Sequence, residues 1–497
     1  MADQRITDWI KQRAGAYAER ESVYQFLAAA YEGGKKFRDG NLFRHSPRET
    51  QADFDRRKKQ AVYPNFVRSV LKTYRDHVFK RGEAISRDID DDAFLVFHED
   101  VDRAGHDISG FWSRVGVREI LYGWMGVLVD MPQAPDLGRE MTRSDVLGLG
   151  MSPYYVQVTP SNIVDWSLDS FGRLNWVHLL TTDVRDDDPF AERAEVPVHQ
   201  LWTRDYWARY DKEGATIAEG EHGLGEVPLV IVRFEESEIH EFIGTSFMED
   251  FAELGRAIMN SESVRGDFLA GNAMQILTVQ LSLMSGDAGG DTAERVIRNL
   301  IEYDPGESGV STHPPQFIGP DVSGAQWMFK HVEALREQMY FMAMLQDSEA
   351  QVGQTAAESG IAKVIDFEQT SAALSSFADG LEQAETEAAR LWFAWQDREW
   401  DEEWSIDYPD TFNVRSLENE LALALQVREV YGDASPTFVA EYLRTLATRI
   451  NEDLPEDLRG VIEDELVSRL ASLSDGAVLP GRLANAAFPS DEEVVVT

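Results

Sequence analysis

The residue types that carry most enzyme and metal chemistry are absent from this sequence or badly spaced in it. The 497-residue chain has no cysteine, which excludes disulfides, thiolate nucleophiles and cysteine-ligated metal sites. Its ten histidines are scattered, and no two of them stand at the spacing of helical metal ligands. The GxxxxGK[ST], HExxH and GxSxG patterns do not occur. We therefore expect no catalytic residues, no cofactor and no metal site.

Acidic residues are too frequent for a carboxylate pair to be informative. The chain contains 88 of them, so adjacent acids are expected by chance. The run at 186–188 lacks the ligand spacing and glycine of a calcium loop, and we interpret it as a solvated loop. His98-Glu99-Asp100 is interpreted as surface. A hydrolase that uses paired carboxylates is disfavoured but stays open.

The net charge of −41 makes broad binding to nucleic-acid phosphates unfavourable. Solubility explains such a charge, and so does a conduit that must not hold what passes through it. One segment has a positive charge: residues 50–82 contain nine basic and three acidic residues, which gives a local charge of +6. This segment is either a solvated helix face or a docking surface for an acidic neighbour, which could be another copy of the chain.

One uncharged stretch, 268–286, approaches the length of a membrane span. Its Asn, Gln, Thr and Ser residues would lack partners in lipid, and from Leu277 to Leu283 apolar and polar residues alternate with the period of a strand. We expect a strand in water here. The first fifteen residues have no apolar core of a signal peptide.

The spacing of apolar residues predicts an α+β fold. Residues 1–82 show helical periodicity, whereas 82–244 consists of short segments rich in β-branched and aromatic residues, separated by Gly, Pro and Asp. We expect a module centred on an antiparallel sheet there. The predicted strand segments are 127–132, 154–158, 162–166, 176–180, 198–210 and 228–232.

Helices are predicted to dominate the rest of the chain. Ser246 with Glu249, and Thr355 with Glu358, have the spacing of capping boxes that begin helices. The second of these helices has an apolar stripe with heptad spacing from Val364 to Trp395, broken by Ser371 and Glu385. Forty helical residues would span about 60 Å, so we expect the stripe to seek a neighbouring subunit, and repetition of such contacts closes a ring.

The order of these parts resembles the portal proteins of tailed bacteriophages. The resemblance covers about residues 55–420 and is strongest in YPNFVRSVLKTYRDHVFKRG (63–82), YGWMGVLVDMP (122–132) and GTSFMEDFAELGRAIMNSESVRGDFL (244–269). It is also good in 359–396. These segments have the general residue pattern of the family, but they contain no diagnostic motif.

The resemblance implies a portal-like architecture with seven parts. They are an α/β wing (1–243), a first stem helix (244–270), a small β-containing clip (271–324), a second stem helix (325–345), a tunnel loop (346–357), a long spine helix (358–409), and a helical crown with a C-terminal tail (410–497).

The resemblance also implies function and partners. Portals are rings, usually of twelve copies, at one capsid vertex of the virion, assembled in the host cytoplasm. They conduct double-stranded DNA without sequence specificity during packaging and ejection, and they contact the large terminase subunit, the major capsid and scaffolding proteins, and the head-tail adaptor. No membrane is involved. Another ring or shell component, such as a scaffold or adaptor, is the alternative within the structural class.

Two sets of residues are assigned by this mapping. The expected DNA-channel residues, in the tunnel loop and second stem helix, are Gln346, Asp347, Ser348, Glu349, Gln351, Gln354, Lys330 and Arg336. The expected oligomer interface, from the clip strand and the heptad stripe, is Val279, Leu281, Phe367, Leu374, Leu381, Trp392 and Trp395.

Overall fold

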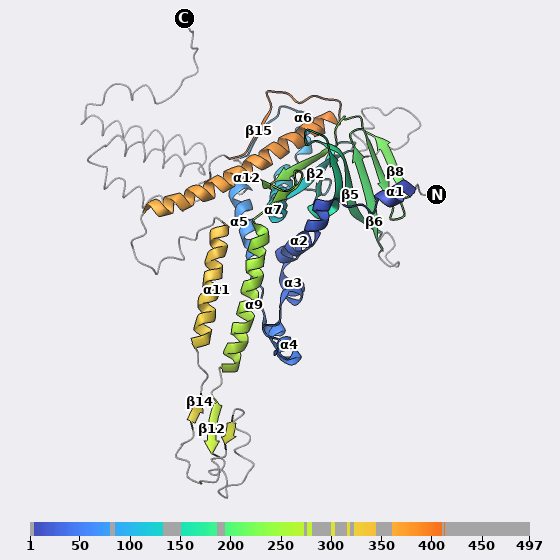
Figure 1. Ribbon diagram of the computed structural model, residues 1–497. Helices are drawn as coiled ribbons and strands as arrows, with labels where there is room; N and C mark the ends of the chain where they lie inside the picture. The colour runs from blue at the N-terminus through green and yellow to red at the C-terminus, as the bar shows by residue number, and fades with distance from the viewer. Residues whose placement is uncertain are drawn as a thin grey trace, which may run out of the picture. The chain divides into compact units, whose positions relative to one another are not determined.

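The chain divides into two compact units, Met1–Phe412 and Asn413–Thr497. The computed structural model (Figure 1) describes residues 4–79, 85–132, 151–185, 194–272, 276–280, 300–303, 316–318, 323–343, 360–409 and 412. All of these belong to the first unit, so the tunnel loop and, apart from residue 412, the expected crown lie outside the described residues. The described part mixes helices and strands, as an α+β fold requires.

Five helices precede the first strand, which confirms the helical prediction for the N-terminal segment. The longer helices bury an apolar face, as α5 does with Val67, Leu71 and Tyr74, whereas α1 has no buried residue. The five are α1 (Gln4–Trp9), α2 (Gly15–Glu32), α3 (Gly34–Asn41), α4 (Gln51–Gln60) and α5 (Phe66–Phe79). After strand β1 (Ser86–Asp88) come α6 (Asp92–Phe97) and α7 (Ile108–Tyr122).

Two antiparallel sheets form the centre of the predicted wing. The larger is a five-stranded meander in the order β4-β5-β6-β7-β8, and the smaller has the order β3-β2-β9. Every residue of β2 is buried, because helices and the second sheet cover its two faces. The meander strands are β4 (Ile163–Leu168), β5 (Leu174–Arg185), β6 (Ala194–Thr203), β7 (Tyr206–Tyr210) and β8 (Thr216–Glu221). The smaller sheet contains β2 (Trp124–Asp130), β3 (Tyr154–Val158) and β9 (Leu229–Arg233).

The segment 198–210, predicted as one stretch of strand, is a hairpin of two. Strand β6 ends at Thr203 and β7 begins at Tyr206. The Thr203 hydroxyl accepts a hydrogen bond from the Tyr206 amide and donates one to its carbonyl, which closes the turn. Strand propensity remains high across the turn, so composition alone does not mark it.

Two antiparallel helices follow the sheets, α9 (Met248–Asn272) and α11 (Ser323–Met342). Their contacts run in opposite sequence directions: Arg265 of α9 lies over the Phe329 ring, whereas Gly255, ten residues earlier, lies beside Met339. Helix α9 begins at Met248, four residues after the start of the expected stem segment (244–270) but within two residues of the predicted cap Ser246, which accepts a hydrogen bond from the Met248 amide. Glu249 pairs with Arg20, so the predicted capping box does not form in full.

A small three-stranded sheet lies between α9 and α11 in the sequence. Strand β12 (Ile276–Gln280) is central, parallel to β13 (Leu300–Tyr303) and antiparallel to β14 (Gln316–Ile318). The strand predicted from alternation at 277–283 therefore exists over Ile276–Gln280.

The long helix α12 (Gly360–Ala394) ends fifteen residues before the position expected from sequence. The chain then turns at Asp397, which has a φ of 54°. Strand β15 (Ser405–Asp407) follows and pairs antiparallel with β1. Strand β1 therefore pairs with residues 405–407, which had been predicted as part of the long helix 358–409.

Candidate functional site

The two described channel candidates, Lys330 and Arg336, are exposed on α11. The Lys330 ammonium lies 5.8 Å from the centre of the Trp327 ring. Arg336 is 3.4 Å from Glu262 of α9, so part of its charge is compensated. The six tunnel-loop candidates, Gln346 to Gln354, lie outside the described residues.

The structure corrects the expected oligomer interface. Leu374, Leu381 and Trp392 are at most 1% exposed within the single chain, so they are not available to a neighbouring copy. Helix α12 packs on α5, α7, β2 and β9, which cover its stripe from Leu374 onward. The heptad pattern thus marks this chain's own core.

The other four interface candidates have different outcomes. Trp395 is half-buried, and its indole donates a 2.8 Å hydrogen bond to the Val129 carbonyl. Val279 lies in β12 and Phe367 in α12, at positions where only the backbone is described. Leu281 lies outside the described residues.

Glu385, which interrupts the apolar stripe, is fully buried and paired. Arg87 of β1 donates to both of its carboxylate oxygens, at 2.5 and 3.2 Å. The Tyr408 hydroxyl donates a further 2.5 Å hydrogen bond. A buried carboxylate needs such donors, so the break in the pattern is the point where α12 holds the β1–β15 pair.

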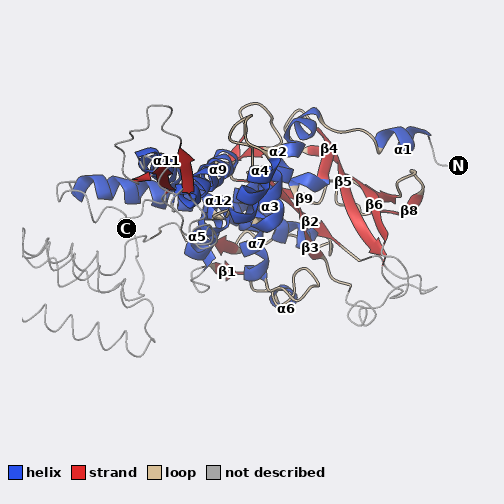
Figure 2. Cartoon of the chain, turned by 90° about the horizontal axis from the view of Figure 1, so that it is seen from below, coloured by secondary structure: helices blue, strands red, loops and turns tan. Residues whose placement is uncertain are grey.

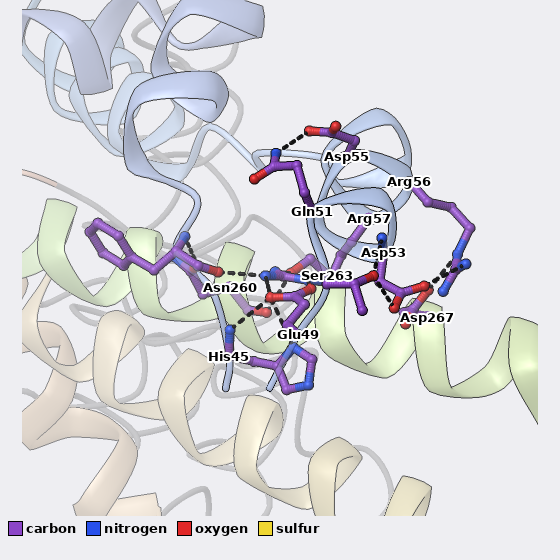
Figure 3. A network of polar contacts seen from close by, with 12 residues as sticks. His45, Glu49, Gln51, Asp53, Asp55, Arg56, Arg57, Asn260, Ser263 and Asp267 are labelled. Atoms are coloured by element: carbon purple, nitrogen blue, oxygen red, sulfur yellow. Dashed lines mark hydrogen bonds and ion pairs between the residues drawn. The ribbon is translucent and has the colours of Figure 1, made fainter. Parts of the chain in front are cut away.

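A second buried ion pair connects α4 to α9 (Figure 3). The side chains of Arg57 and Glu49 are each 1% exposed, and the guanidinium donates to the carboxylate at 2.8 and 2.9 Å. Arg57 also donates to the Ser263 hydroxyl of α9 at 2.8 Å. Hydrogen bonding from Arg57 lowers the pKa of Glu49 to about 2. Part of the basic segment is therefore structural, because this charge is neutralised inside the chain.

Large apolar side chains are exposed on α11 to an extent that sequence analysis missed. Trp327 is 74% and Phe341 is 70% exposed, and Phe329 and Tyr340 are also exposed. They stand outside the helically spaced apolar set Met328, Val332, Leu335, Met339 and Met342, of which Val332 and Met339 are buried. The sequence indicated this exposure in one way only: the aromatic residues of this helix occupy more than one of its faces, so a single packing partner cannot bury them all.

Phe341 lines an open groove of about 850 Å³ between α9 and α11. Its apolar residues include Leu254, Ala257 and Met342, and its carboxylates are Asp250, Glu253 and Glu337. An apolar surface edged by charged residues is typical of a protein contact. We call these residues the acidic groove.

Two groups of buried titratable side chains lie in the predicted wing. His178 is fully buried, hydrogen-bonded to His199 at 2.9 Å and stacked on Trp9 with ring centres 4.0 Å apart. Burial lowers the pKa of His178 to about 3 and also lowers that of His199. Glu119 of α7 is fully buried, neither carboxylate oxygen has a hydrogen-bond partner among the described residues, and burial raises its pKa well above the usual range.

Neither group has the surroundings of an active site. No set of three or more His, Asp or Glu side chains that could hold a metal ion occurs among the described residues. No helix in the described part of the chain is long and apolar enough to cross a membrane. The Arg87–Glu385 and Arg57–Glu49 pairs each connect segments that are distant in the sequence, through α12 and α9.

Comparison with known proteins finds similarity only at the level of structure. No family model and no curated protein matches the chain. A chain from the neck of an empty gene transfer agent particle aligns with a TM-score of 0.39 and 8% identity, over 81% of this chain and 94% of that one. A chain from the virion of a native gene transfer agent particle gives 0.37 and 12%, over 76% of this chain and 88% of that one. A third, from the neck of the native particle, gives 0.35 and 10% over 76% and 88%.

Proposed function

We propose that the chain is a structural, non-enzymatic subunit of a portal-like ring at one capsid vertex of a tailed-phage-like virion. The observation that carries the proposal is the succession of α9, the small sheet, α11 and α12. A pair of antiparallel helices joined by a small sheet, followed by a long helix packed on an α/β module, is the order that the resemblance to portals implies.

The surfaces of these elements support assembly. Helix α11 has one face against α9 and exposes four large aromatic side chains on the rest of its surface. An exposed apolar area of this kind is unfavourable in an isolated subunit and is explained by a neighbour. The three-stranded sheet also has β13 and β14 at its edges, and short edge strands are points of contact with other chains.

In the proposed assembly, 1–243 is the wing, 244–270 and 325–345 are the stem, and 271–324 is the clip. The loop 346–357 lines the DNA channel, 358–409 begins with the long helix, and 410–497 forms the crown. Terminase would dock on the clip during packaging, and the head-tail adaptor afterwards. Capsid and scaffolding proteins are the remaining partners. The net charge of −41 suits a conduit that DNA passes without being held.

Particle shape tests the proposal directly. We expect negative-stain images of the purified full-length chain to show closed rings with an axial hole. We expect native mass spectrometry to give a mass of about twelve copies for these rings. A chain that remains monomeric or dimeric at micromolar concentration and moderate salt would contradict the ring. A filled shell or an open filament would favour the scaffold or adaptor alternative.

A further inference from the structure

A ring of identical subunits needs two different, complementary surfaces on opposite flanks of each copy. We propose that the acidic groove of one copy binds the α3–α4 region of the next copy. This inference rests on the proposed ring and names the surfaces that close it. The occupant of the groove is thus a second copy of this chain.

The groove offers apolar area and unpaired negative charge together. Phe341, one of its lining residues, is 70% exposed, which leaves a large aromatic ring in solvent. Asp250 and Glu337 have no ion pair among the described residues. Glu253 pairs with Arg256 within its own helix and remains 45% exposed. A partner must therefore bring positive charge and apolar contact.

The α3–α4 region carries both. Lys35 and Lys36 of α3, Arg48, and Lys59 of α4 are exposed, and none of them forms an ion pair within the described part of the chain. We call these four residues the basic flank. Phe43 and Val62, at 53% and 72% exposure, add apolar surface to the same stretch of sequence.

The middle of the groove and the contact with α4 lie on different faces of α9, while Glu253 at the edge of the groove pairs with Arg256, which also lies 5.3 Å from the centre of the Phe43 ring. Leu254, in the groove, and Ser263, which contacts α4, are nine residues apart and therefore about 180° apart around the helix. On α4, Lys59 is two residues beyond Arg57 and so about 200° away from the side chain that contacts α9. Figures 1 and 2 both draw α9 between α11 on one side and α4 on the other.

This arrangement suits head-to-tail repetition. A copy placed beside the groove presents its own α4 side, and its groove then faces the following copy. The internal Arg57–Glu49 pair fixes α4 on α9, so the spacing between the groove and the basic flank is held within each subunit. The acidic groove and the basic flank are also opposite in charge, whereas two copies meeting groove to groove would repel.

Two charge-reversal variants test the pairing. The groove variant carries Glu253→Lys and Glu337→Lys, and the flank variant carries Arg48→Glu and Lys59→Glu. We expect each to raise the concentration for half-maximal ring formation at least tenfold, while its unfolding midpoint stays near that of the wild type. A chain carrying all four substitutions has restored complementarity and should form rings again.

Mixing the two variants gives the sharpest readout. Each variant alone presents like charges at every contact. In a mixture the native groove of the flank variant can meet the native flank of the groove variant, and the reversed groove can meet the reversed flank, so unlike chains are complementary at both contacts. Mass photometry of an equimolar mixture should therefore show mixed rings, whereas each variant alone shows none at the same concentration. The matched control, Lys212→Glu with Glu221→Lys at exposed sites on the β7–β8 side of the wing, should form rings like the wild type.

The outcomes separate the inference from the proposed function. If the wild type forms no ring, the proposed function is wrong. If the wild type and both single-surface variants form equally stable rings, the function stands and the groove–flank contact is overturned. Loss of rings in both variants without mixed rings in the mixture and without rescue by the fourfold reversal would also overturn it.

Discussion

Arg57 and Glu49 form a doubly hydrogen-bonded ion pair that is buried where α4 packs on α9. The guanidinium and carboxylate meet at 2.8 and 2.9 Å with side chains 1% exposed, and Arg57 reaches Ser263 and the Phe43 carbonyl as well. Every nitrogen of the guanidinium therefore has an acceptor. Because α4 contributes little apolar area of its own, with Arg57 as its buried residue, this pair holds the helix on α9.

Removing one partner of this pair should destabilise the protein strongly. We expect Arg57→Met to lower the free energy of unfolding by about 3–5 kcal/mol, because the buried Glu49 carboxylate would lose its guanidinium donors and keep only the contacts with His45. Denaturant unfolding followed by far-ultraviolet circular dichroism measures it. The control is Arg56→Met, at a side chain 54% exposed, which should change stability by less than about 1 kcal/mol. Equal effects of the two variants would contradict the structural role of Arg57.

The same pair gives a pH dependence of known sign. The folded-state pKa of Glu49 is about 2, below the ordinary 4.5 of the unfolded chain. Its stabilisation is therefore complete above pH 4.5 and is lost as the pH falls from 4.5 toward 2. In Glu49→Gln this part of the acid sensitivity should be missing, so the stability gap between variant and wild type should narrow as the pH falls through that window. A constant gap from pH 7 to pH 3 would contradict it.

The buried pair of His178 and His199 should make the wing sensitive to mild acid. The unfolded chain binds a proton at His178 near pH 6.5, but the folded chain does so only near 3. Stability is therefore present above 6.5 and falls as the pH drops below it, by about 2 kcal/mol at pH 5. Arg13 disfavours protonation of both rings, whereas Asp211 favours it at His199.

His178→Phe tests this effect while keeping a ring against Trp9. We expect the variant to lose less stability than the wild type between pH 7 and pH 5, measured by thermal unfolding with tryptophan fluorescence. If His178→Phe shows the wild-type pH dependence, the buried pair is not its source.

Glu119 should be a position where an apolar residue stabilises the protein. Its buried carboxyl has no hydrogen-bond partner among the described residues, and it lies near Gly380, where α12 packs on α7. We expect Glu119→Met to raise the free energy of unfolding by about 1–3 kcal/mol at pH 8. The exposed Glu99→Met should stay within about 0.5 kcal/mol of the wild type.

The sign of the pH effect at Glu119 is opposite to that at Glu49. Because its folded-state pKa is raised, its stability contribution is most favourable below the unfolded pKa of 4.5 and declines as the pH rises through the folded pKa. The advantage of Glu119→Met should therefore grow from pH 5 to pH 8. A variant less stable than the wild type at both values would mean that the carboxyl has a partner in solution.

Periodicity located most elements in the described part of the chain. Strand β3 was predicted at its observed bounds, 154–158, because alternating and β-branched residues are flanked by a proline on each side. The end of α12 was not predicted, because nothing in the residues after Ala394 stops a helix as clearly as a proline or glycine would. Strand β15 follows this helix, and the strand with which it pairs, β1, lies more than 300 residues earlier in the sequence. No local sequence pattern predicts a pairing between such distant segments.

The heptad stripe shows where sequence reasoning about surfaces fails. Spacing identified Leu374, Leu381 and Trp392 as one apolar face, which is correct, but it could not tell that the cover comes from the same chain. Burial of Glu385 was equally unpredictable, since it depends on Arg87 from a distant strand. Conversely, Trp327 and Phe341 are exposed although both are large and apolar. The choice between core and interface requires the tertiary packing.

The strand of the proposed clip should contribute to assembly through one of its faces. The alternation in the sequence predicts that Val279 and Leu281 share one side of the strand and that Thr278 and Gln280 share the other. We expect Val279→Asp with Leu281→Asp to weaken ring closure, measured by the loss of rings on dilution, while near-ultraviolet circular dichroism of the wing is unchanged. The matched control is Thr278→Asp with Gln280→Asp. Undiminished ring stability in the first variant would remove the clip from the interface.

The last prediction concerns the proposed tunnel loop, Gln346 to Gln354. The segment QDSEAQVGQ has two acids and no base, so it cannot hold phosphates by charge and should contact passing DNA without binding it. It follows α11, whose buried residues Val332 and Met339 anchor that helix on α9. Replacing the loop by a Gly/Ser linker of equal length should therefore leave ring formation intact.

The same replacement should reduce the amount of DNA that particles package or retain, because the channel would lose the side chains proposed to line it. Quantification of encapsidated DNA in particles assembled with the variant measures this. The comparison is Lys330→Ala with Arg336→Ala, which removes the nearest exposed cations and tests transient phosphate contact separately from the loop. Since Arg336 already pairs with Glu262, we expect this second variant to have the smaller effect. Normal packaging and retention with the linker would show that the loop does not serve the conduit and that the channel has been assigned to the wrong residues.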